Sequence, residues 1–417
     1  MTVRLKQLRP LLITTAIAAI LSGCGESTSS NAGSNYGGQA NVTPPTTPPS
    51  SEFNETKLLT NLSDNVIAPA YQAFSEQTAA AHQVINNYCQ AQSSALLTQA
   101  QTSWRDAMAQ WQQIEMMQIG PLTENSSTLR NNIYSWPVVS SCGVDQDVMY
   151  FEQGVINTTP YDITARTSTR RGLDALEYLL FNQNTAHSCS TQKDILNTWA
   201  DKSDAQRITA RCNFAVEVAN DLNNSASLLV AQWSGENGHG QVLQNAGQEN
   251  NKYATAHDGV NALSDALFYL DKMTKDEKLA TPLGFFSNSC GGVGSVCPEN
   301  VESPYSDNSI DNLINNLIGF KALFNGQGID AQNTLGFDDY LIEVNDSATA
   351  TKMQADVDAA ISDLQSYNQS LAQSISQDAA SAEATHGKVK QVTDQLKVDF
   401  INSLALKLPQ TAAGDND

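Results

Sequence analysis

The chain has 417 residues, of which 41% are hydrophobic, and its formal net charge is −21 at pH 7. This length is sufficient for two domains with cores of their own. The excess of acidic residues argues against nucleic acid as a partner, because the phosphate backbone binds basic surfaces. It favours cations only in a general way, and solubility explains it equally well.

Residues 1–23 have the pattern of a bacterial lipoprotein signal peptide. Three basic residues precede an apolar run that ends in the sequence LSGC, which is typical of an export signal rather than of a folded segment. The LSGC sequence resembles a lipobox, which implies cleavage before Cys24, acylation of Cys24 and the membrane as a partner through a lipid anchor. Gly25 follows in place of the aspartate of inner-membrane retention, so we expect the outer membrane, facing the periplasm or the surface. A plain secretory signal ending in cysteine is the alternative.

Residues 24–54 consist mainly of Ser, Thr, Asn, Gly and Pro. Such a composition has little apolar surface to bury, so we predict a disordered linker that tethers a folded body to the membrane. After this linker no segment has the roughly 20 apolar residues that a spanning helix needs. We therefore expect the rest of the chain to be soluble.

Apolar residues recur at helical spacing through most of the chain after residue 57, and strand-like alternation is scarce. We therefore predict an all-α fold. Between residues 236 and 256, Gly, Asn and Gln replace the apolar pattern, which indicates a connector. The prediction is two helical-bundle halves, residues 55–235 and 257–408, related by an internal duplication and followed by a tail at 409–417.

Six cysteines remain besides the one in the lipobox, an even number that favours disulfides in an oxidising compartment. None of them has the CxxC spacing of a zinc site. Many pairings are open to six cysteines, and the short flexible loop GGVGSV supports one bridge across it. The predicted bridges are Cys290–Cys297, Cys189–Cys212 and Cys89–Cys142.

Glu115 interrupts an apolar helix face. Apolar residues step by four and three along this face as far as Trp111, and the next step reaches Glu115. A carboxylate on such a face would be partly buried and would need a partner to stay charged, and Arg130 is one candidate. The alternative is a glutamate in the last helical turn that reaches water beside Gly120 and Pro121.

Asp174 and Glu177 are three residues apart beside the apolar stripe of the segment RRGLDALEYLLF, residues 170–181. They share one flank of a predicted helix. Three interpretations are open: the carboxylates form ion pairs, they are solvated at the edge of the stripe, or they form half of a cation or proton site. An ion pair between Asp174 and Arg170 or Arg171 would contribute only a few tenths of a kcal/mol. Gly172 within this helix indicates close packing of a neighbouring helix rather than chemistry.

A second polar cluster precedes the apolar stripe that begins at Ile310. Side chains of Ser, Asp and Asn provide the oxygen that the free N–H groups of a first helical turn need, so helix capping is the preferred interpretation. A place in a polar site is the alternative. The cluster consists of Ser306, Asp307, Asn308 and Ser309.

Four blocks of the sequence carry a resemblance to a known family. They are residues 104–121, 129–137 with Trp136 and Pro137, 170–181 with Gly172, and 302–326 with Glu302, Ser306 and Asn308. In this order they are similar to imelysin-like proteins, a family that includes iron-regulated envelope proteins and is related to the helical domain of the EfeO iron-uptake component. The resemblance covers about residues 57 to 405. It implies two bundle-like helical halves with a site near their interface, and a role linked to iron acquisition.

The motif of this family is Gly-x-His-x-x-Glu, and this chain departs from it at one position. The sequence GLDALE carries Gly172 and Glu177 but has Asp174 in place of the histidine. Two carboxylates offer only oxygen, which suits harder ions such as ferric iron, calcium or magnesium. No HExxH is present, so a zinc peptidase loses its main ligand. The predicted metal- or ligand-binding residues are Asp174, Glu177, Glu115, Arg130 and Asp307.

We therefore predict a lipid-anchored envelope protein that binds iron, an iron complex or an iron-uptake partner between two helical halves. The cofactor is not specified by the sequence, beyond a preference for iron or another hard cation. A metallopeptidase-like hydrolase is the alternative, and a structural or adhesive surface lipoprotein is a third reading. There is no GxSxG elbow, Walker loop or dinucleotide motif to support other catalysis, and no catalytic residue is assigned.

Overall fold

The computed structural model describes residues 53–191, 193–328, 334–410 and 412. The predicted signal peptide, Cys24 and nearly all of the predicted linker lie outside these residues. None of the helices in the described ranges is both long and apolar enough to cross a membrane.

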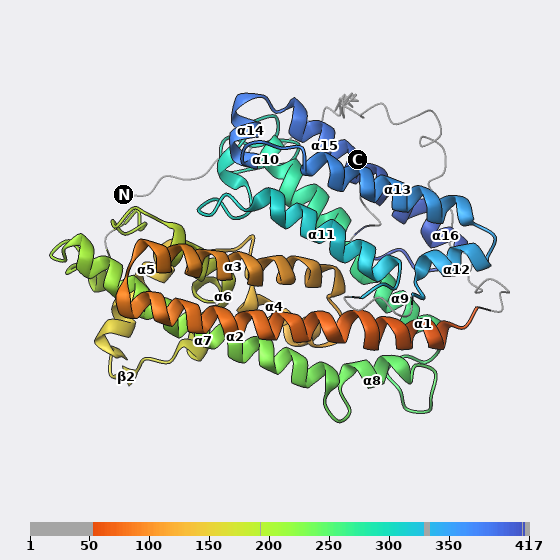
Figure 1. The fold of residues 1–417 in the computed structure, drawn as a ribbon, viewed down its shortest axis with the longest axis horizontal. Helices are drawn as coiled ribbons and strands as arrows, with labels where there is room; N and C mark the ends of the chain where they lie inside the picture. Colours follow the sequence, from red (N-terminus) through yellow and green to blue (C-terminus); the bar gives the residue numbers. More distant parts are fainter. Residues whose placement is uncertain (1–52, 192, 329–333, 411, 413–417) are drawn as a thin grey trace, which may run out of the picture. The chain divides into compact units, whose positions relative to one another are not determined.

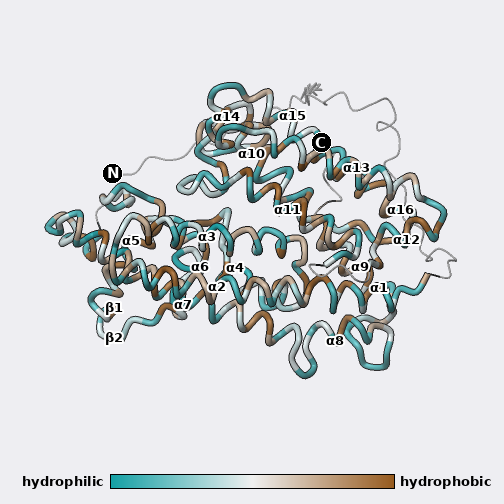
Figure 2. The backbone as a smooth tube through the Cα atoms, in the orientation of Figure 1, coloured by the Kyte–Doolittle hydropathy of each residue, from teal (hydrophilic) through white to brown (hydrophobic). Residues whose placement is uncertain are grey.

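The described chain is helical, with one short antiparallel pair of strands, β1 (Val155–Ile156) and β2 (Thr159–Pro160), as Figure 1 shows. The predicted all-α class is therefore confirmed. Figure 2 shows that hydrophobic and hydrophilic residues alternate along each helix, as helical periodicity requires. The tryptophans of the stripe before Glu115 are buried, Trp104 at 1% exposure and Trp111 at 0%.

Three long helices form the framework of the first half. They are α2 (Ala68–Ala91), α3 (Ser94–Ile114) and α7 (Asp204–Ser234), and α2 packs against both of the others. The α7 helix begins with a capping box, in which Ser203 and Gln206 bind each other's backbone N–H groups. The shorter elements of this half are α1 (Glu55–Asn61), η1 (Leu62–Ile67), η2 (Glu115–Met117), η3 (Gly120–Leu122), α4 (Glu124–Ile133), α5 (Ser141–Gln153), η4 (Ile163–Ala165), η5 (Ser168–Arg170), α6 (Gly172–Phe181) and η6 (Asp194–Leu196).

In the second half, α11 (Ser309–Phe324) packs against both α3 and α13 (Ser347–Leu364), and α13 packs against α15 (Ala380–Gln395). Figure 1 shows α11 beside α3, which brings the second half onto the first. The remaining elements are α8 (His239–Gln244), α9 (Ala256–Leu267), the π-helix η7 (Leu270–Ala280), α10 (Thr281–Leu283), η8 (Pro298–Asn300), α12 (Phe337–Glu343), α14 (Leu371–Gln377), η9 (Leu396–Phe400) and α16 (Ile401–Ser403).

The predicted connector at 236–256 contains the helix α8, which packs against α7 and α1. Gly, Asn and Gln in this segment therefore surround a short helix. The exact division into two halves and their origin by duplication stay predictions.

The described residues contain three disulfides, and two of them differ from the predicted pairing. Cys290 is bonded to Cys297 as expected, but Cys89 is bonded to Cys212 and Cys142 to Cys189. The reason is the packing of α2 against α7, which brings the Cα atoms of Cys89 and Cys212 to 5.3 Å from each other. This contact depends on the packing of the two helices and cannot be inferred from how far apart the cysteines are in the sequence.

Candidate functional site

Gly172 is the first residue of α6 and fixes where that helix begins. Its φ is +77°, a left-handed conformation, and a Cβ atom there would lie 2.4 Å from the carbonyl oxygen of Ile133. Only glycine allows the end of α4 to approach so closely. The expectation of close helix packing at Gly172 is therefore correct, although the residue starts the helix instead of lying inside it.

Arg170 and Arg171 precede α6 and do not pair with Asp174. Arg170 Nη1 lies 3.0 Å from Asp147 Oδ1, and Arg171 Nε donates to Asp221 Oδ2 at 2.7 Å. The alternative in which Asp174 forms an intrahelical ion pair with either arginine is therefore wrong. It requires both arginines to continue the helix, whereas Arg171 is the residue before its first turn.

Asp174 is held by one serine that follows α4. The backbone N–H and the hydroxyl of Ser135 both donate to Asp174 Oδ2, each at 2.7 Å. No hydrogen bond from the described residues reaches Asp174 Oδ1. This carboxylate thus has one anchored oxygen and one that is open to a ligand.

Glu177 is held in the same way from the segment before α11. The backbone N–H and hydroxyl of Ser306 donate to Glu177 Oε1 at 2.9 and 2.8 Å, and the N–H of Tyr305 donates to the same oxygen at 3.0 Å. Within the described part of the chain, Glu177 Oε2 accepts no hydrogen bond. Two serines from distant segments therefore orient two neighbouring carboxylates.

Asp174 and Glu177 line a cleft of about 380 Å³ between α6 and the segments on either side of η8. Besides these two residues, Glu277 and Glu299 belong to its wall, whereas no lysine, arginine or histidine is among its lining residues. We call this space the acidic cleft. Its aromatic lining residues are Tyr134, Trp136, Tyr178 and Tyr305.

Burial changes the charge state of both carboxylates. It raises the pKa of Asp174 to about 7, against the opposing effects of the Ser135 hydrogen bonds and the Arg130 charge. It also raises the pKa of Glu177 to about 7, and the Asp174 charge adds to this rise. Both groups therefore hold a proton to a higher pH than an exposed carboxyl does, and a bound cation would favour the ionised form of both.

Glu115 is completely buried, so the alternative in which it reaches water is wrong. Its partner is Lys278 from η7, whose Nζ lies 2.8 Å from Glu115 Oε2 and 3.1 Å from Glu302 Oε1. The same ammonium donates to Gln112 Oε1 at 2.6 Å and Asn316 Oδ1 at 2.9 Å. This buried cluster joins η2, η7 and α11, and Glu115 is not a lining residue of the acidic cleft.

Arg130 and Asp307 belong to the predicted ligand set, but neither lies in the wall of the acidic cleft. Arg130 Nη1 donates to the carbonyl oxygen of Trp136 at 3.2 Å, so it supports the cleft wall from behind. Asp307 is exposed, with a φ of +56°, and neither residue is among those that line the cleft. Of the candidate partners for Glu115, Lys278 makes the ion pair, whereas Arg130 acts on Glu115 only through its charge, which raises the pKa of Arg130.

The polar cluster at 306–309 does not cap α11 through its side chains. Asn308 holds the N-cap position, yet its side chain donates to Asn312 Oδ1 at 2.8 Å and makes no capping bond. The Ser306 hydroxyl is used by Glu177, and the Ser309 hydroxyl donates to the carbonyl oxygen of Glu302. The preferred capping interpretation is therefore wrong, because tertiary contacts take these side chains.

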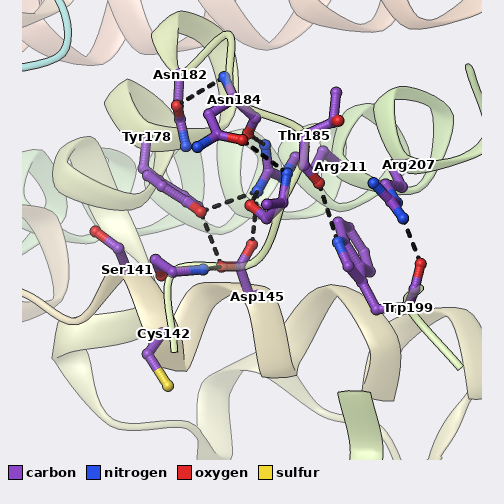
Figure 3. Close-up of polar contacts among 12 residues, drawn as sticks. Ser141, Cys142, Asp145, Tyr178, Asn182, Asn184, Thr185, Trp199, Arg207 and Arg211 are labelled. Carbon is purple, nitrogen blue, oxygen red and sulfur yellow. Dashed lines mark hydrogen bonds and ion pairs between the residues drawn. The ribbon is translucent and has the colours of Figure 1, made fainter. Parts of the chain in front are cut away.

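A further polar network, which the sequence did not reveal, orients Tyr178 on the cleft wall (Figure 3). Its hydroxyl donates to Asp145 Oδ2 at 2.8 Å, and Arg211 Nη2 lies 3.0 Å from Asp145 Oδ1 and 2.9 Å from the same hydroxyl. The Ser188 hydroxyl also donates to Asp145, at 2.9 Å. The DALEY segment gives no local signal for this network, whose members come from α5, α6, α7 and the segment that follows α6.

The acidic cleft does not form a closed metal site. In the described ranges, one group of three His, Cys, Asp or Glu residues has ligand atoms close enough for a shared ion, namely Cys290, Cys297 and Glu299. Both cysteines are joined in a disulfide and are not available as thiolates. The cleft itself offers the free oxygens of Asp174 and Glu177, so a cation bound there must bring other ligands with it.

The fold and the site define a predominantly helical protein with an acidic cleft beside α6. The chain belongs to the imelysin family, since the family model described as Imelysin matches residues 67–398. No curated protein matches the chain.

Two solved structures share the fold. An iron-regulated protein A precursor from Parabacteroides distasonis has 16% identity and a TM-score of 0.66, with 86% of this chain and 97% of that chain covered. An imelysin-like protein from Psychrobacter arcticum has 15% identity and a TM-score of 0.59, with 86% of this chain and 99% of that chain covered.

Proposed function

We propose that this protein is a lipid-anchored envelope protein that takes part in iron acquisition by binding a hard cation, as an ion or a complex, in the acidic cleft. One observation carries the proposal. Asp174 and Glu177 each have one oxygen fixed by a serine and the other free, and both line a cleft with no basic side chain in its wall.

The chemistry of these groups favours a hard cation. Carboxylate oxygens are preferred by ferric iron, calcium and magnesium. The serine hydrogen bonds fix the orientation of both carboxylates before a ligand arrives, which reduces the entropy lost on binding. A cation between them would also relieve the repulsion that raises the pKa of Glu177.

The relatives supply the link to iron. The protein from Parabacteroides distasonis is described as iron-regulated, and this chain shares its fold and belongs to the imelysin family. The sequence pattern at Cys24 supports an envelope location with a lipid anchor. A metallopeptidase-like activity has less support, because catalytic zinc usually has three protein ligands, often histidines, and no histidine lines the cleft.

Titration of the full chain, purified from the envelope fraction, tests the proposal. Ferrous iron under anaerobic conditions, gallium as a redox-inert substitute for ferric iron, and calcium are titrated by calorimetry. Each cation is titrated both as the aqua ion and as a chelate, and we expect saturable binding of at least one of these forms at about one equivalent. The double variant Asp174→Asn/Glu177→Gln keeps the size of both side chains and should weaken that binding at least about tenfold.

The matched control is Asp201→Asn/Glu343→Gln, which removes the same two kinds of charge from exposed positions outside the cleft. It should bind like the unmodified protein. Equal affinity in the cleft variant and the unmodified protein, or an equal loss in the control, would overturn the proposal.

A further inference from the structure

We propose that the acidic cleft takes its metal as a chelate, an ion already wrapped in a neutral or positively charged organic chelator, and rejects negatively charged chelates. This inference rests on the proposed function and specifies the class of ligand. Four features of the cleft support it, namely its charge, its ligand set, its size and its rim.

The charge of the cleft favours a positive ligand. Four carboxylates belong to its lining, and no lysine, arginine or histidine does. Two cations lie behind the wall without lining the cleft. Lys278 is paired with Glu115 and Glu302, and Arg130, whose charge acts on Asp174, donates to the carbonyl oxygen of Trp136. A chelate with negative charge would meet repulsion without a counter-charge in the wall.

The ligand set is too small for a bare ion. Two free carboxylate oxygens remain on Asp174 and Glu177, and no third His, Cys, Asp or Glu of the described chain lies close enough to join them around one ion. Hard cations take six or more oxygen ligands. An organic chelator supplies the missing oxygen ligands. The free carboxylates then interact with positively charged groups or hydrogen-bond donors on the outer surface of the chelate.

The size of the cleft is also better suited to a chelate than to a hydrated ion. Its volume of about 380 Å³ is room for roughly a dozen water molecules at about 30 Å³ each, whereas a six-coordinate aqua ion needs about half of that. Clefts of roughly 300 to 1,000 Å³ bind small organic molecules. A hydrated ion would leave much of the space to loosely held water.

Part of the rim of the cleft is apolar, which suits the carbon skeleton of a chelator. Val139 and Tyr305 line the cleft and are 48% and 39% exposed. Scattered exposed apolar residues need no explanation, but Val138, which is 66% exposed, lies between the lining residues Pro137 and Val139 and extends this apolar part. The exposed lining residues Ser287, Ser289 and Glu299 form a polar part of the same rim.

A charge series of chelates tests the inference on the full chain. The probes are ferric desferrioxamine B, which is singly positive, ferrichrome, which is neutral, and a ferric tricatecholate, which is triply negative. Binding is measured by quenching of tryptophan fluorescence, since Trp136 lines the cleft. We expect the positive chelate to bind at least about tenfold more tightly than the tricatecholate, with the neutral one between them.

The wall variant Glu277→Gln/Glu299→Gln tests whether the cleft selects chelates by their charge or by their shape. It leaves Asp174 and Glu177 in place and should weaken the positive chelate about three- to tenfold, while ferrichrome binds as before. Metal-free desferrioxamine B keeps its ammonium group, and it should bind much more weakly than the ferric complex. Asp201→Asn/Glu343→Gln serves again as the exposed control.

The outcomes distinguish this inference from the proposed function. Tight binding of the tricatecholate, equal binding of the metal-free chelator, or binding of aqua ions with no chelate bound would overturn the inference while the cation site stands. If Asp174→Asn/Glu177→Gln changes the affinity for no ion and no chelate, both proposals fall.

Discussion

Asp174 and Glu177 lie one turn apart on α6, yet the serines that hold them belong to different halves of the chain. Ser135 follows α4, whereas Ser306 precedes α11, and each donates a backbone N–H and a hydroxyl to one oxygen of its carboxylate. Any movement of the second half relative to α6 would therefore change the environment of Glu177 first. The relationship leads to several testable consequences.

The first prediction concerns pH and cation affinity. Both carboxyls have a pKa of about 7 in the folded protein, and only the ionised forms attract a cation strongly. Affinity should therefore rise between pH 6 and pH 8, and binding near pH 7 should release protons. Calorimetry in two buffers of different ionisation enthalpy measures this release; a result of no released protons at pH 7 contradicts it.

The second prediction concerns stability without a ligand. Both pKa values are higher in the folded chain than the ordinary carboxyl values near 4 expected after unfolding. Between about pH 4 and pH 7 the folded state binds more protons, so the stability that these groups contribute at low pH is lost as the pH rises through 7. Asp174→Asn/Glu177→Gln should thus be more stable than the unmodified protein at pH 8, by about 2–5 kcal/mol.

At pH 4.5 the same variant should have nearly the stability of the unmodified protein, because both carboxyls are then already neutral. Urea denaturation at the two pH values measures the difference. A variant that is less stable at pH 8 would show that the charged carboxylates stabilise the fold, contrary to this reasoning.

The third prediction concerns the buried ammonium of Lys278. Lys278→Met leaves Glu115 and Glu302 without their cation in a site of 0% and 1% exposure. Loss of one partner from a buried ion pair costs about 3–5 kcal/mol, so we expect a decrease of that size in the free energy of unfolding.

The control for Lys278 is Lys321→Met, which breaks an ion pair with Asp358 that is largely exposed. It should cost less than about 1 kcal/mol. Adding Glu115→Gln to Lys278→Met should restore part of the lost stability, since one unpaired charge is removed. Similar costs for the two lysine variants would argue against a special role for the buried cluster.

The fourth prediction compares two glycines. Gly172→Ala places a Cβ atom against the Ile133 carbonyl oxygen at a φ of +77°, and we expect a loss of about 2 kcal/mol or more together with weaker ligand binding. Gly387 lies inside α15 with no atom within 4 Å of its would-be Cβ. Gly387→Ala should instead stabilise the protein by up to about 1 kcal/mol. Thermal unfolding of both variants checks the opposite signs.

The fifth prediction compares two disulfides in their contributions to stability and to chelate binding. Cys89–Cys212 closes a loop of 123 residues and Cys290–Cys297 one of 7, so their contributions should be about 5 and about 2 kcal/mol in the chain-entropy model. Replacing the short bridge by two serines should weaken chelate binding more than replacing the long one, because the neighbours Ser289 and Glu299 line the cleft. Chelate titrations of both double variants under conditions where both remain folded decide this.

The helices were predictable from the sequence because their signals are local. The stripe through Trp104 and Trp111 needs only residues three or four apart to be recognised, and both side chains are buried as expected. The start of α6 also had a local signal, since a glycine after two arginines is compatible with the left-handed conformation that begins the helix at Gly172. From the sequence alone, this glycine indicates close packing but not the start of the helix.

The contacts of the site were not predictable because they join distant parts of the chain. Glu115 meets Lys278 across 163 residues, and Cys89 meets Cys212 across 123. A sequence pattern that spans the length of one helix cannot reveal pairs that are so far apart in the chain. The sequence did indicate that Glu115 requires a buried partner, but the identity of that partner depends on how η7 packs beside α3 and α11.

The donors of Glu177 have a consequence for how the protein is made. All three come from Tyr305 and Ser306, 128 and 129 residues further along the chain. A growing polypeptide that has completed α6 and α7 already contains Ser135 beside Asp174, but it has nothing to hold Glu177. On the proposed function, the cation site would therefore be complete only in a chain that has been synthesised past Ser306.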